Sequence, residues 1–399
     1  MTASEQLAQF AAGSKALPKL CREYKKERAT VHLKELVGGA LSFYAAAAVA
    51  KTGGVHIFVA EDRDAAAYLL NDFYNLLDEK QVYFFPSSYK RSAAYGAEDA
   101  QGVVQRTTAM NAVRGFTKGY LVVCTYPEAL AERVVDAATL QRDTIAVKLG
   151  DKISIAVLED ALADANFTRV DFVYEPGQYS VRGGIVDVFS YSESKPYRID
   201  FFGDEVDSIR RFNISSQLSA DKLDRVEIVP NLNAGEAPRV SFVQFAGSSA
   251  TCWFYDADYV LRRVNDLRRK VLADMEEPGQ IDRLLTSRNV LLRDMAGNSV
   301  VALRDNLPER PATAAVVFDT APQPKFNKNF EMLADDMIRN SLRGYATYIL
   351  SENKVQVERL ENIFHQIGRG QAAVRSLSVT LHEGFVDNDL KPVSYTHLR

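Results

Sequence analysis

Two glycines near the start of the chain, Gly38 and Gly39, have the outline of a phosphate-binding loop. They follow an apolar segment and precede a run of small residues, ALSFYAAAAVA, that is typical of a helix. A working loop of this kind needs glycine N–H groups, a lysine that reaches the β- and γ-phosphates, and a Ser or Thr hydroxyl for Mg²⁺. Ser42 supplies a hydroxyl, but no lysine stands where a phosphate would need one. We therefore expect no ATP hydrolysis, and weak or no triphosphate binding.

Two roles for this degenerate loop stay open. The glycines can serve only to let a helix begin close to a strand, because glycine accepts backbone conformations that other residues avoid. Alternatively, the bare N-terminus of the helix keeps some attraction for phosphate. In either case the sequence predicts no cofactor and no catalytic residue.

Other residues with chemical potential are scattered. The five histidines show no HxH or HxxxH spacing, and the three cysteines lie far apart at Cys21, Cys124 and Cys252. These patterns argue against a metal site and against a disulfide framework. The sequence also has no local signature of a Ser/His/Asp arrangement. We expect no metal and a reducing environment.

The segment around the glycine loop alternates strands with helices. The apolar run VHIFVAED precedes the helical pattern RDAAAYLLNDFYNLL, and GYLVVCT leads through Pro127 into EALAERVV. This order predicts a parallel sheet with crossover helices. Between these units, FFPSSYKRSAAYGAEDAQG is polar and rich in turn residues, so we expect a strand end and an exposed connection.

A different pattern begins near residue 149. The runs GQYSVRGGIVDVFSY, PYRIDFFGDEVDSIRRFN and RVEIVPN alternate with period two, which indicates antiparallel strands. Gly203, Asp204 and Glu205 separate two alternating runs and predict a hairpin turn. After residue 230 the α/β pattern returns, with a basic stretch, RRVNDLRRK, interpreted as a solvated helix face or as a minor nucleic-acid or interdomain contact. The tail LKPVSYTHLR ends abruptly after a strand-like signal, and its last residues continue no pattern, which predicts a truncated or foreign end.

The expected fold class is α/β. A parallel-sheet, P-loop-like domain of a degenerate NTPase is interrupted by a small antiparallel α+β domain and followed by a further small α/β domain. The expected parts are an N-terminal helical segment (1–29), a first α/β part (30–140), the inserted α+β domain (141–226), a second α/β part (227–326) and the last small α/β domain (327–399).

Composition narrows the class of protein. The formal net charge of −4 gives no whole-molecule attraction for nucleic acid, since such binding depends on Lys and Arg. No segment approaches the ~18 consecutive apolar residues of a membrane span. The N-terminus has no basic start followed by an apolar core, so no secretion signal is recognised. We expect a soluble, cytoplasmic protein without membrane contact.

The antiparallel segment TRVDFVYEPGQYSVRGGIVDVFSYSESKPYRIDFFGDEVDSIRRFNISSQLS resembles the UvrB-homology module of the bacterial transcription-repair coupling factors (Mfd). FFPSS, YLVVCTYPEAL, KFNKNFEML and EGFV occur in the order in which that family has them. The resemblance covers residues 30–390 and stops before the family's RNA-polymerase-binding domain and its ATP-driven DNA translocase motor. It implies an amino-terminal region of a larger bacterial protein.

The resemblance implies a non-catalytic adaptor that binds UvrA and so links stalled RNA polymerase to nucleotide excision repair. Contacts with RNA polymerase and DNA would belong to the missing C-terminal domains, and this region would help to restrain the motor. The alternative is a UvrB-like, ATP-dependent DNA-damage-binding protein. UvrB, however, keeps an intact GKT-type loop and an aromatic-rich hairpin, where this chain has GGALSFY and FFPSSYKRSAAYGAED.

Basic residues of the inserted domain are the family's UvrA contacts, and Arg169 and Arg182 match two of them. A further arginine of UvrB is replaced by Ser180. A guanidinium offers carboxylates a planar fork of donors, which suits an interface. Arg182 could equally pair with Asp187 or Glu175. Phe189 is either an apolar anchor for the partner or a core residue.

Three further glycines of the inserted domain, Gly177, Gly183 and Gly184, are interpreted as a bulge or a tight turn. They are expected to orient the edge that carries Arg182 rather than to contact a partner.

Overall fold

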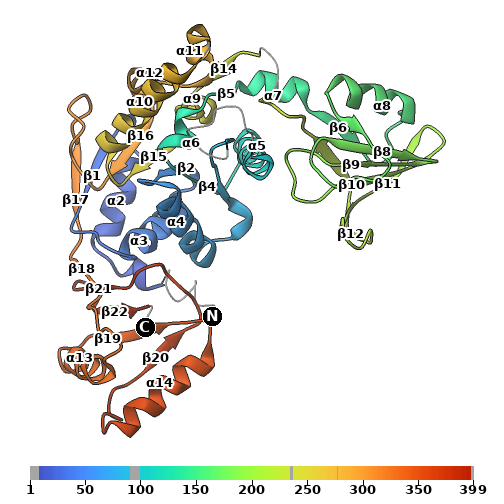
Figure 1. Cartoon of the computed structure of the whole chain (residues 1–399). Coiled ribbons are helices and arrows are strands. Elements are labelled where there is room, and N and C mark those ends of the chain that lie inside the picture. Colours follow the sequence, from blue (N-terminus) through green and yellow to red (C-terminus); the bar gives the residue numbers. More distant parts are fainter. Residues whose placement is uncertain (1–8, 90–98, 234–236, 276, 397–399) are drawn as a thin grey trace.

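The computed structural model describes residues 9–89, 99–233, 237–275 and 277–396. A large α/β body carries a β-rich module on one side, and a smaller α/β unit packs below it (Figure 1). Residues 90–98, which belong to the connection predicted after FFPSS, lie outside the described residues. Among the described helices, none is both long and apolar enough to span a bilayer.

The body contains a seven-stranded sheet in the order β17-β1-β16-β15-β2-β4-β3, and each neighbouring pair is parallel. Strand β1, from before the module in the chain, lies between β17 and β16, which come after the module. Both parts of the chain therefore build one sheet. The predicted parallel α/β layer is confirmed. Its strands are β1 (Thr30–Lys34), β2 (Gly54–Val59), β3 (Val82–Phe84), β4 (Tyr120–Thr125), β15 (Thr251–Phe254), β16 (Ser299–Ala302) and β17 (Ala314–Val317).

Helices cover both faces of this sheet, and each face has its own hydrophobic core. The central strands are buried along nearly their whole length, as expected for a parallel sheet enclosed by helices. The helices of the body are α2 (Ala16–Tyr24), α3 (Ala40–Thr52), α4 (Arg63–Leu76), α5 (Ala100–Gly115), α6 (Pro127–Ala131), α7 (Ala137–Asp143), α9 (Phe242–Ala246), α10 (Ala257–Asp274), α11 (Ile281–Leu284) and α12 (Arg288–Asp294).

Local sequence explains where the main helices begin. Asp62 caps α4 by accepting a hydrogen bond from the Ala65 N–H, and Asp256 caps α10 in the same way through Tyr259. The glycine-preceded helix α3 has no side-chain cap, and its small residues let it pack against neighbours on nearly all sides.

The β-rich module has a six-stranded sheet in the order β12-β11-β10-β9-β8-β7 and a separate β6–β13 pair. Its neighbouring strands are antiparallel, except for the parallel pair β7 and β8. The predicted hairpin turn is confirmed, since Gly203 and Asp204 join β10 to β11. The elements are β6 (Ile145–Lys148), α8 (Ile155–Asp164), β7 (Thr168–Arg169), β8 (Gln178–Arg182), β9 (Ile185–Val188), β10 (Tyr197–Phe202), β11 (Glu205–Phe212), β12 (Ser219–Leu223) and β13 (Arg225–Ile228).

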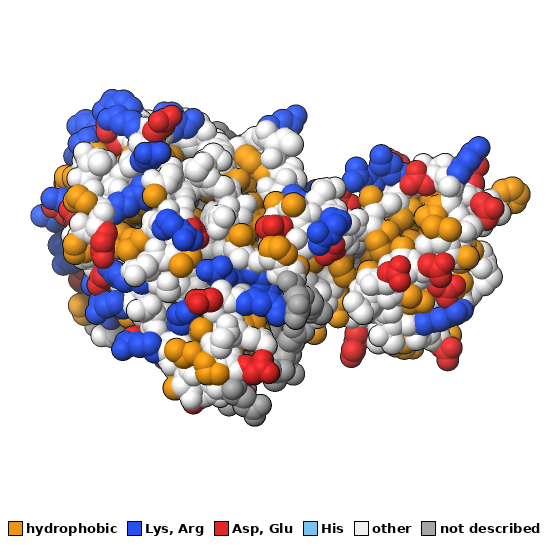
Figure 2. All heavy atoms as spheres, turned by 90° about the horizontal axis from the view of Figure 1, so that it is seen from above, with side chains coloured by type: hydrophobic (Ala, Val, Ile, Leu, Met, Phe, Trp, Pro, Cys, Tyr) orange, Lys and Arg blue, Asp and Glu red, His pale blue; other side chains and the backbone are white. Residues whose placement is uncertain are grey.

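The module is attached to the body mainly through α5. Arg114 Nη2 lies 2.5 Å from Glu227 Oε2, and the Thr108 hydroxyl donates to the Ser192 carbonyl at 2.9 Å. Viewed from above, the module forms a lobe set apart from the body (Figure 2). Most of its surface therefore stays accessible in this chain.

The last unit has a mixed five-stranded sheet in the order β18-β21-β22-β19-β20. The tail contributes β22, which lies between β21 and β19, where the sequence has a strand-like signal. The truncated or foreign end stays a prediction, because residues 397–399 lie outside the described residues. The elements are β18 (Thr320–Pro322), α13 (Phe330–Leu342), β19 (Ala346–Leu350), α14 (Lys354–Gln366), β20 (Arg375–Leu377), β21 (Phe385–Asp387) and β22 (Pro392–Tyr395).

Candidate partner-binding surface and glycine loop

Arg182 lies at the end of β8, immediately before the tight turn to β9. Its Nη2 is 2.5 Å from Asp187 Oδ2, and its Cζ lies 4.7 Å from the centre of the Phe172 ring. The side chain is 36% exposed. The sequence allowed Asp187 or Glu175 as the ion-pair partner of Arg182, and in the structure the partner is Asp187.

Asp187 is a buried carboxylate that serves two arginines. Arg198, its cross-strand neighbour on β10, donates from Nε to Oδ1 at 2.7 Å and from Nη2 to Oδ2 at 2.8 Å. These hydrogen bonds, which Arg198 donates to the Asp187 carboxylate, raise the pKa of Arg198. The one carboxylate of Asp187 thus faces two guanidinium groups. The sequence analysis missed Arg198, although the hairpin alternation places it opposite Asp187.

Arg169 lies on the edge strand β7 and pairs with Glu159 of α8 at 2.6 Å. It is paired in register with Tyr179, three residues before Arg182 along β8. Because side chains alternate along a strand, Arg169 lies on the α8 side of the sheet and Arg182 on the other side. The structure therefore brings both arginines to the same edge, but not to the same face.

Phe189 is 5% exposed and follows β9 in the interior of the module. Its N–H donates to the Gln178 carbonyl, and its own carbonyl accepts from Gly177. Of the two roles that the sequence left open, a core position fits this burial.

Two exposed aromatic residues were not predicted from the sequence, and one of them, Phe172, packs against Arg182. Phe172 and Tyr174 are 49% and 59% exposed, in the segment between β7 and β8. This segment has no strand periodicity that would have revealed its outward side chains. Gly183, with φ +60°, makes the turn after Arg182, and a Cβ at Gly184 would lie 3.0 Å from the Phe201 carbonyl oxygen. The predicted role of these two glycines in a tight turn is confirmed.

The glycine loop is covered by another part of the same chain. A Cβ at Gly39 would overlap the Glu383 carbonyl oxygen, and a Cβ at Gly38 would lie 2.8 Å from the Gly384 carbonyl oxygen. Residues 381–384, which we call the closing segment, therefore pack directly on both glycines. Here the glycines allow a close backbone approach, and Gly38 also adopts a φ of +56°.

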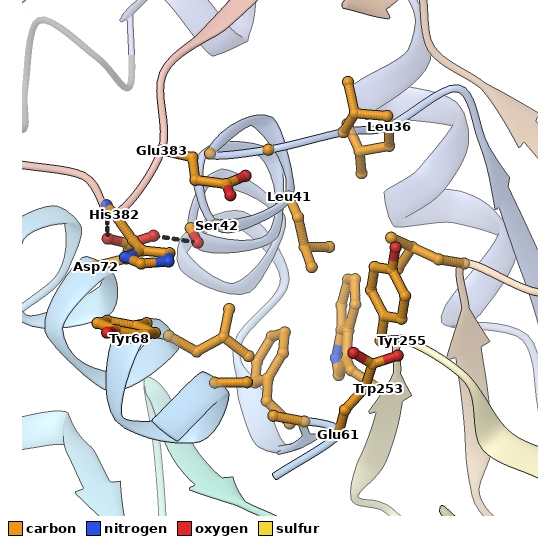
Figure 3. Close-up of a pocket in the computed structure, with 18 of the residues that line it drawn as sticks. Leu36, Leu41, Ser42, Glu61, Tyr68, Asp72, Trp253, Tyr255, His382 and Glu383 are labelled. Carbon is orange, nitrogen blue, oxygen red and sulfur yellow. Dashed lines mark hydrogen bonds between the residues drawn. The ribbon is translucent and has the colours of Figure 1, made fainter. Parts of the chain in front are cut away.

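Ser42 takes part in an internal hydrogen-bond network. Its hydroxyl donates to Asp72 Oδ2 at 2.6 Å, and Asp72 Oδ1 accepts from the His382 N–H of the closing segment at 2.7 Å (Figure 3). Burial raises the pKa of Asp72 to about 6. The His382 ring stacks on Tyr68 with centroids 3.6 Å apart. These contacts hold α3, α4 and the closing segment together.

The basic stretch RRVNDLRRK forms part of α10. Arg262 pairs with Asp258 at 2.8 Å, and Arg263 pairs with Glu128 of α6 at 2.7 Å. Such pairing fits a solvated helix face better than a surface prepared for phosphates.

Known proteins are similar to parts of this chain. A family model described as the UvrB interaction domain matches residues 145–233, which run from β6 to just beyond β13. The transcription-repair-coupling factors of Bacillus subtilis and Escherichia coli are each 27% identical over 199 residues, which is 50% of this chain and 17% of theirs. The chain is similar to the coupling factors. The coupling factor of Haemophilus influenzae is 35% identical over 101 residues, or 25% of this chain and 9% of that protein.

The resemblance predicted from the sequence is thus confirmed. The match covers about half of this chain and about a sixth of the coupling factors' own length. The residues that match the UvrB interaction domain, 145–233, include the edge that carries Arg169 and Arg182.

Proposed function

We propose that this chain is the amino-terminal, non-catalytic adaptor region of a transcription-repair coupling factor, and that its module recruits UvrA. The match of residues 145–233 to the UvrB interaction domain carries the proposal. The module stands clear of the body, so a large partner can approach it (Figure 2). UvrA bound there would link stalled RNA polymerase to nucleotide excision repair.

Arg182 is the proposed centre of the contact. It is half-exposed, held in place by Asp187 and stacked on Phe172. A positioned guanidinium loses little conformational freedom on binding, which favours an interface hot spot. Arg169 would contribute from the α8 side, since its pair with Glu159 is exposed and worth only ~0 to 1 kcal/mol. Phe189 would support this edge from the core.

A structural role for the P-loop-like fold supports an adaptor rather than an enzyme. The closing segment occupies the place in front of Gly38 and Gly39, and Ser42 is bonded to Asp72. The proposed body is a degenerate NTPase domain that supports the module. This arrangement disfavours the alternative of a UvrB-like, ATP-dependent DNA-damage-binding protein.

Two parts of the proposal concern the longer protein. RNA polymerase and DNA would be bound by C-terminal domains, and this region would contact and restrain the translocase motor until polymerase is engaged. Both follow from the likeness to coupling factors, which this chain matches over 17% of their length.

The first prediction tests the arginines. Replacing Arg169 and Arg182 together by Ala removes the proposed charge-assisted contacts, and the Kd for purified UvrA is expected to rise at least about tenfold. Isothermal titration calorimetry measures the Kd for UvrA of the parent chain and of the double variant. Arg225→Ala is the matched control, because Arg225 is an exposed arginine of the same module whose Nη2 pairs with Glu227 at 2.7 Å. Its Kd should stay within about twofold. A folded double variant that binds UvrA as tightly as the parent contradicts the assignment.

A further inference from the structure

A cavity of about 340 Å³ remains beside the closed glycine loop, at the carboxyl ends of β1, β2 and β15 (Figure 3). Open α/β sheets bind ligands at this edge. The volume is that of a small-molecule site. The closing segment contributes His382 and Glu383 to one wall, so the cavity persists although the glycines are covered.

The walls of this cavity are largely apolar and aromatic. Phe58 and Trp253 stack with ring centroids 4.9 Å apart, and the partly exposed Tyr255 stands at the rim. Aromatic faces attract a cation placed within about 6 Å of the ring centre. Tyr255 already has one such neighbour, since Arg304 Cζ lies 5.5 Å from its ring while Asp256 holds the guanidinium.

The charges that face the cavity are negative. Glu61 approaches from the end of β2, and Glu383 approaches from the closing segment on the opposite side (Figure 3). Among the described residues, neither carboxylate has a hydrogen-bond or ion-pair partner. Asp72 lies deeper and is bonded to Ser42 and His382. No lysine or arginine is among the described residues that line the cavity.

We propose that this cavity binds an organic cation, an ammonium or guanidinium group carried on an apolar body. The apolar body packs against Phe58 and Trp253, and the cationic group lies near Tyr255 between the carboxylates of Glu61 and Glu383. This proposal is independent of UvrA binding, because it concerns another face of the molecule.

Two other ligand classes fit the cavity poorly. A phosphate would face unpaired carboxylates without a lining lysine or arginine to balance its charge. A bare metal ion would lack its usual ligands, because the described part of the chain has no group of three His, Cys, Asp or Glu residues arranged to hold one.

The second prediction uses the single tryptophan, Trp253, as the reporter. Cyclohexanecarboxamidine and its neutral isostere cyclohexanecarboxamide are titrated into the full chain while tryptophan fluorescence is recorded. The amidine is expected to give a saturable change, and the amide should bind at least about tenfold more weakly. A change of equal affinity for both compounds, or no saturable change with the amidine, overturns the proposal. This comparison needs no variant.

Two variants then test whether the carboxylates of Glu61 and Glu383 attract the cation. Replacing Glu61 and Glu383 together by Gln should weaken amidine binding at least about tenfold, whereas Glu352→Gln, which changes an exposed carboxylate of the last unit, should leave it within about twofold. Retained binding in a folded double variant overturns the assignment.

The source of the cation is resolved by a second pair of probes. The tripeptide acetyl-Gly-Arg-Gly-amide is compared with the same peptide containing citrulline. Saturable binding of both the amidine and the arginine peptide, but not of the citrulline peptide, shows that a protein side chain can supply the cation. Binding of the amidine without binding of the arginine peptide identifies a small-molecule site. Both results support the proposal, and equal binding of the two peptides contradicts it.

Discussion

Single buried carboxylates organise two distant parts of this molecule. Asp187 positions Arg182 and Arg198 in the module, and Asp72 joins Ser42 to the closing segment. A buried carboxylate is costly unless donors satisfy it, so each of these positions depends on its partners. Asp187 thus fixes the guanidinium of Arg182, and Asp72 helps to hold the closing segment over the glycine loop.

The third prediction follows from the pKa of Asp72, which burial raises from 3.8 to about 6. Between these values the folded chain holds a proton that the unfolded chain has released. The contribution of Asp72 to the free energy of unfolding is therefore fully present below pH 3.8, and it is lost as the pH rises through 6. Relative to the parent, the free energy of unfolding of Asp72→Asn should rise by up to about 3 kcal/mol between pH 4 and 7.

Urea unfolding of both chains at several pH values measures this difference. His56 serves as an internal check, because burial lowers its pKa to about 4 and gives the opposite slope in both chains. That contribution cancels in the comparison. A difference between the two chains that does not change with pH contradicts the role given to Asp72.

Elements that are far apart in the chain meet at the glycine loop. The turn between β1 and α3 receives the closing segment that precedes β21, so the last unit is joined to the body at the position where a nucleotide site would otherwise open. Asn75 of α4 adds to this joint by donating to the Thr380 carbonyl at 3.0 Å. The glycines are thus a packing surface between units.

The fourth prediction tests this joint. Gly39 has helical φ and ψ angles that alanine accepts, so the cost of Gly39→Ala comes from overlap with the Glu383 carbonyl. Overpacking of this kind is expected to destabilise the chain by about 1 to 3 kcal/mol. Hydrogen exchange should also show a less protected His382 amide, because that N–H is bonded to Asp72.

Gly115→Ala is the matched control, since Gly115 ends α5 and a Cβ there would meet no atom within 4 Å. It should be neutral or slightly stabilising, because alanine restricts the unfolded chain more than glycine does. Equal stability and equal amide protection in Gly39→Ala and the parent would remove the support for a packed joint.

Periodicity explains which elements were predictable from the sequence. Apolar runs such as β2 and β4 indicated the parallel sheet, and alternation in β10 and β11 indicated the hairpin between them. The position of the closing segment and the pairing of β22 depend on contacts with distant residues, which leave no local pattern. The exposed Phe172 lies in an irregular segment, so only the structure reveals its position beside Arg182.

At the scale of the whole molecule, the amino-acid sequence alone indicates two features and leaves two others hidden. The missing lysine indicates a degenerate loop, and the motif of the module indicates a family. The interruption of one α/β domain by the module was predicted, but the order of the strands in the shared sheet and the separate lobe that the module forms depend on long-range packing and are visible only in the fold. With a net charge of −4, long-range attraction to DNA is weak, and recognition of a protein partner agrees better with this balance.

The fifth prediction concerns the central claim, that this chain binds UvrA and is not itself an ATP-driven enzyme. Calorimetric titration of UvrA into the chain, with magnesium-ATP titrated in parallel, measures both properties on one preparation. The account predicts a saturable heat with UvrA and none with magnesium-ATP. Absence of UvrA binding, or saturable nucleotide binding accompanied by turnover above background, would contradict it.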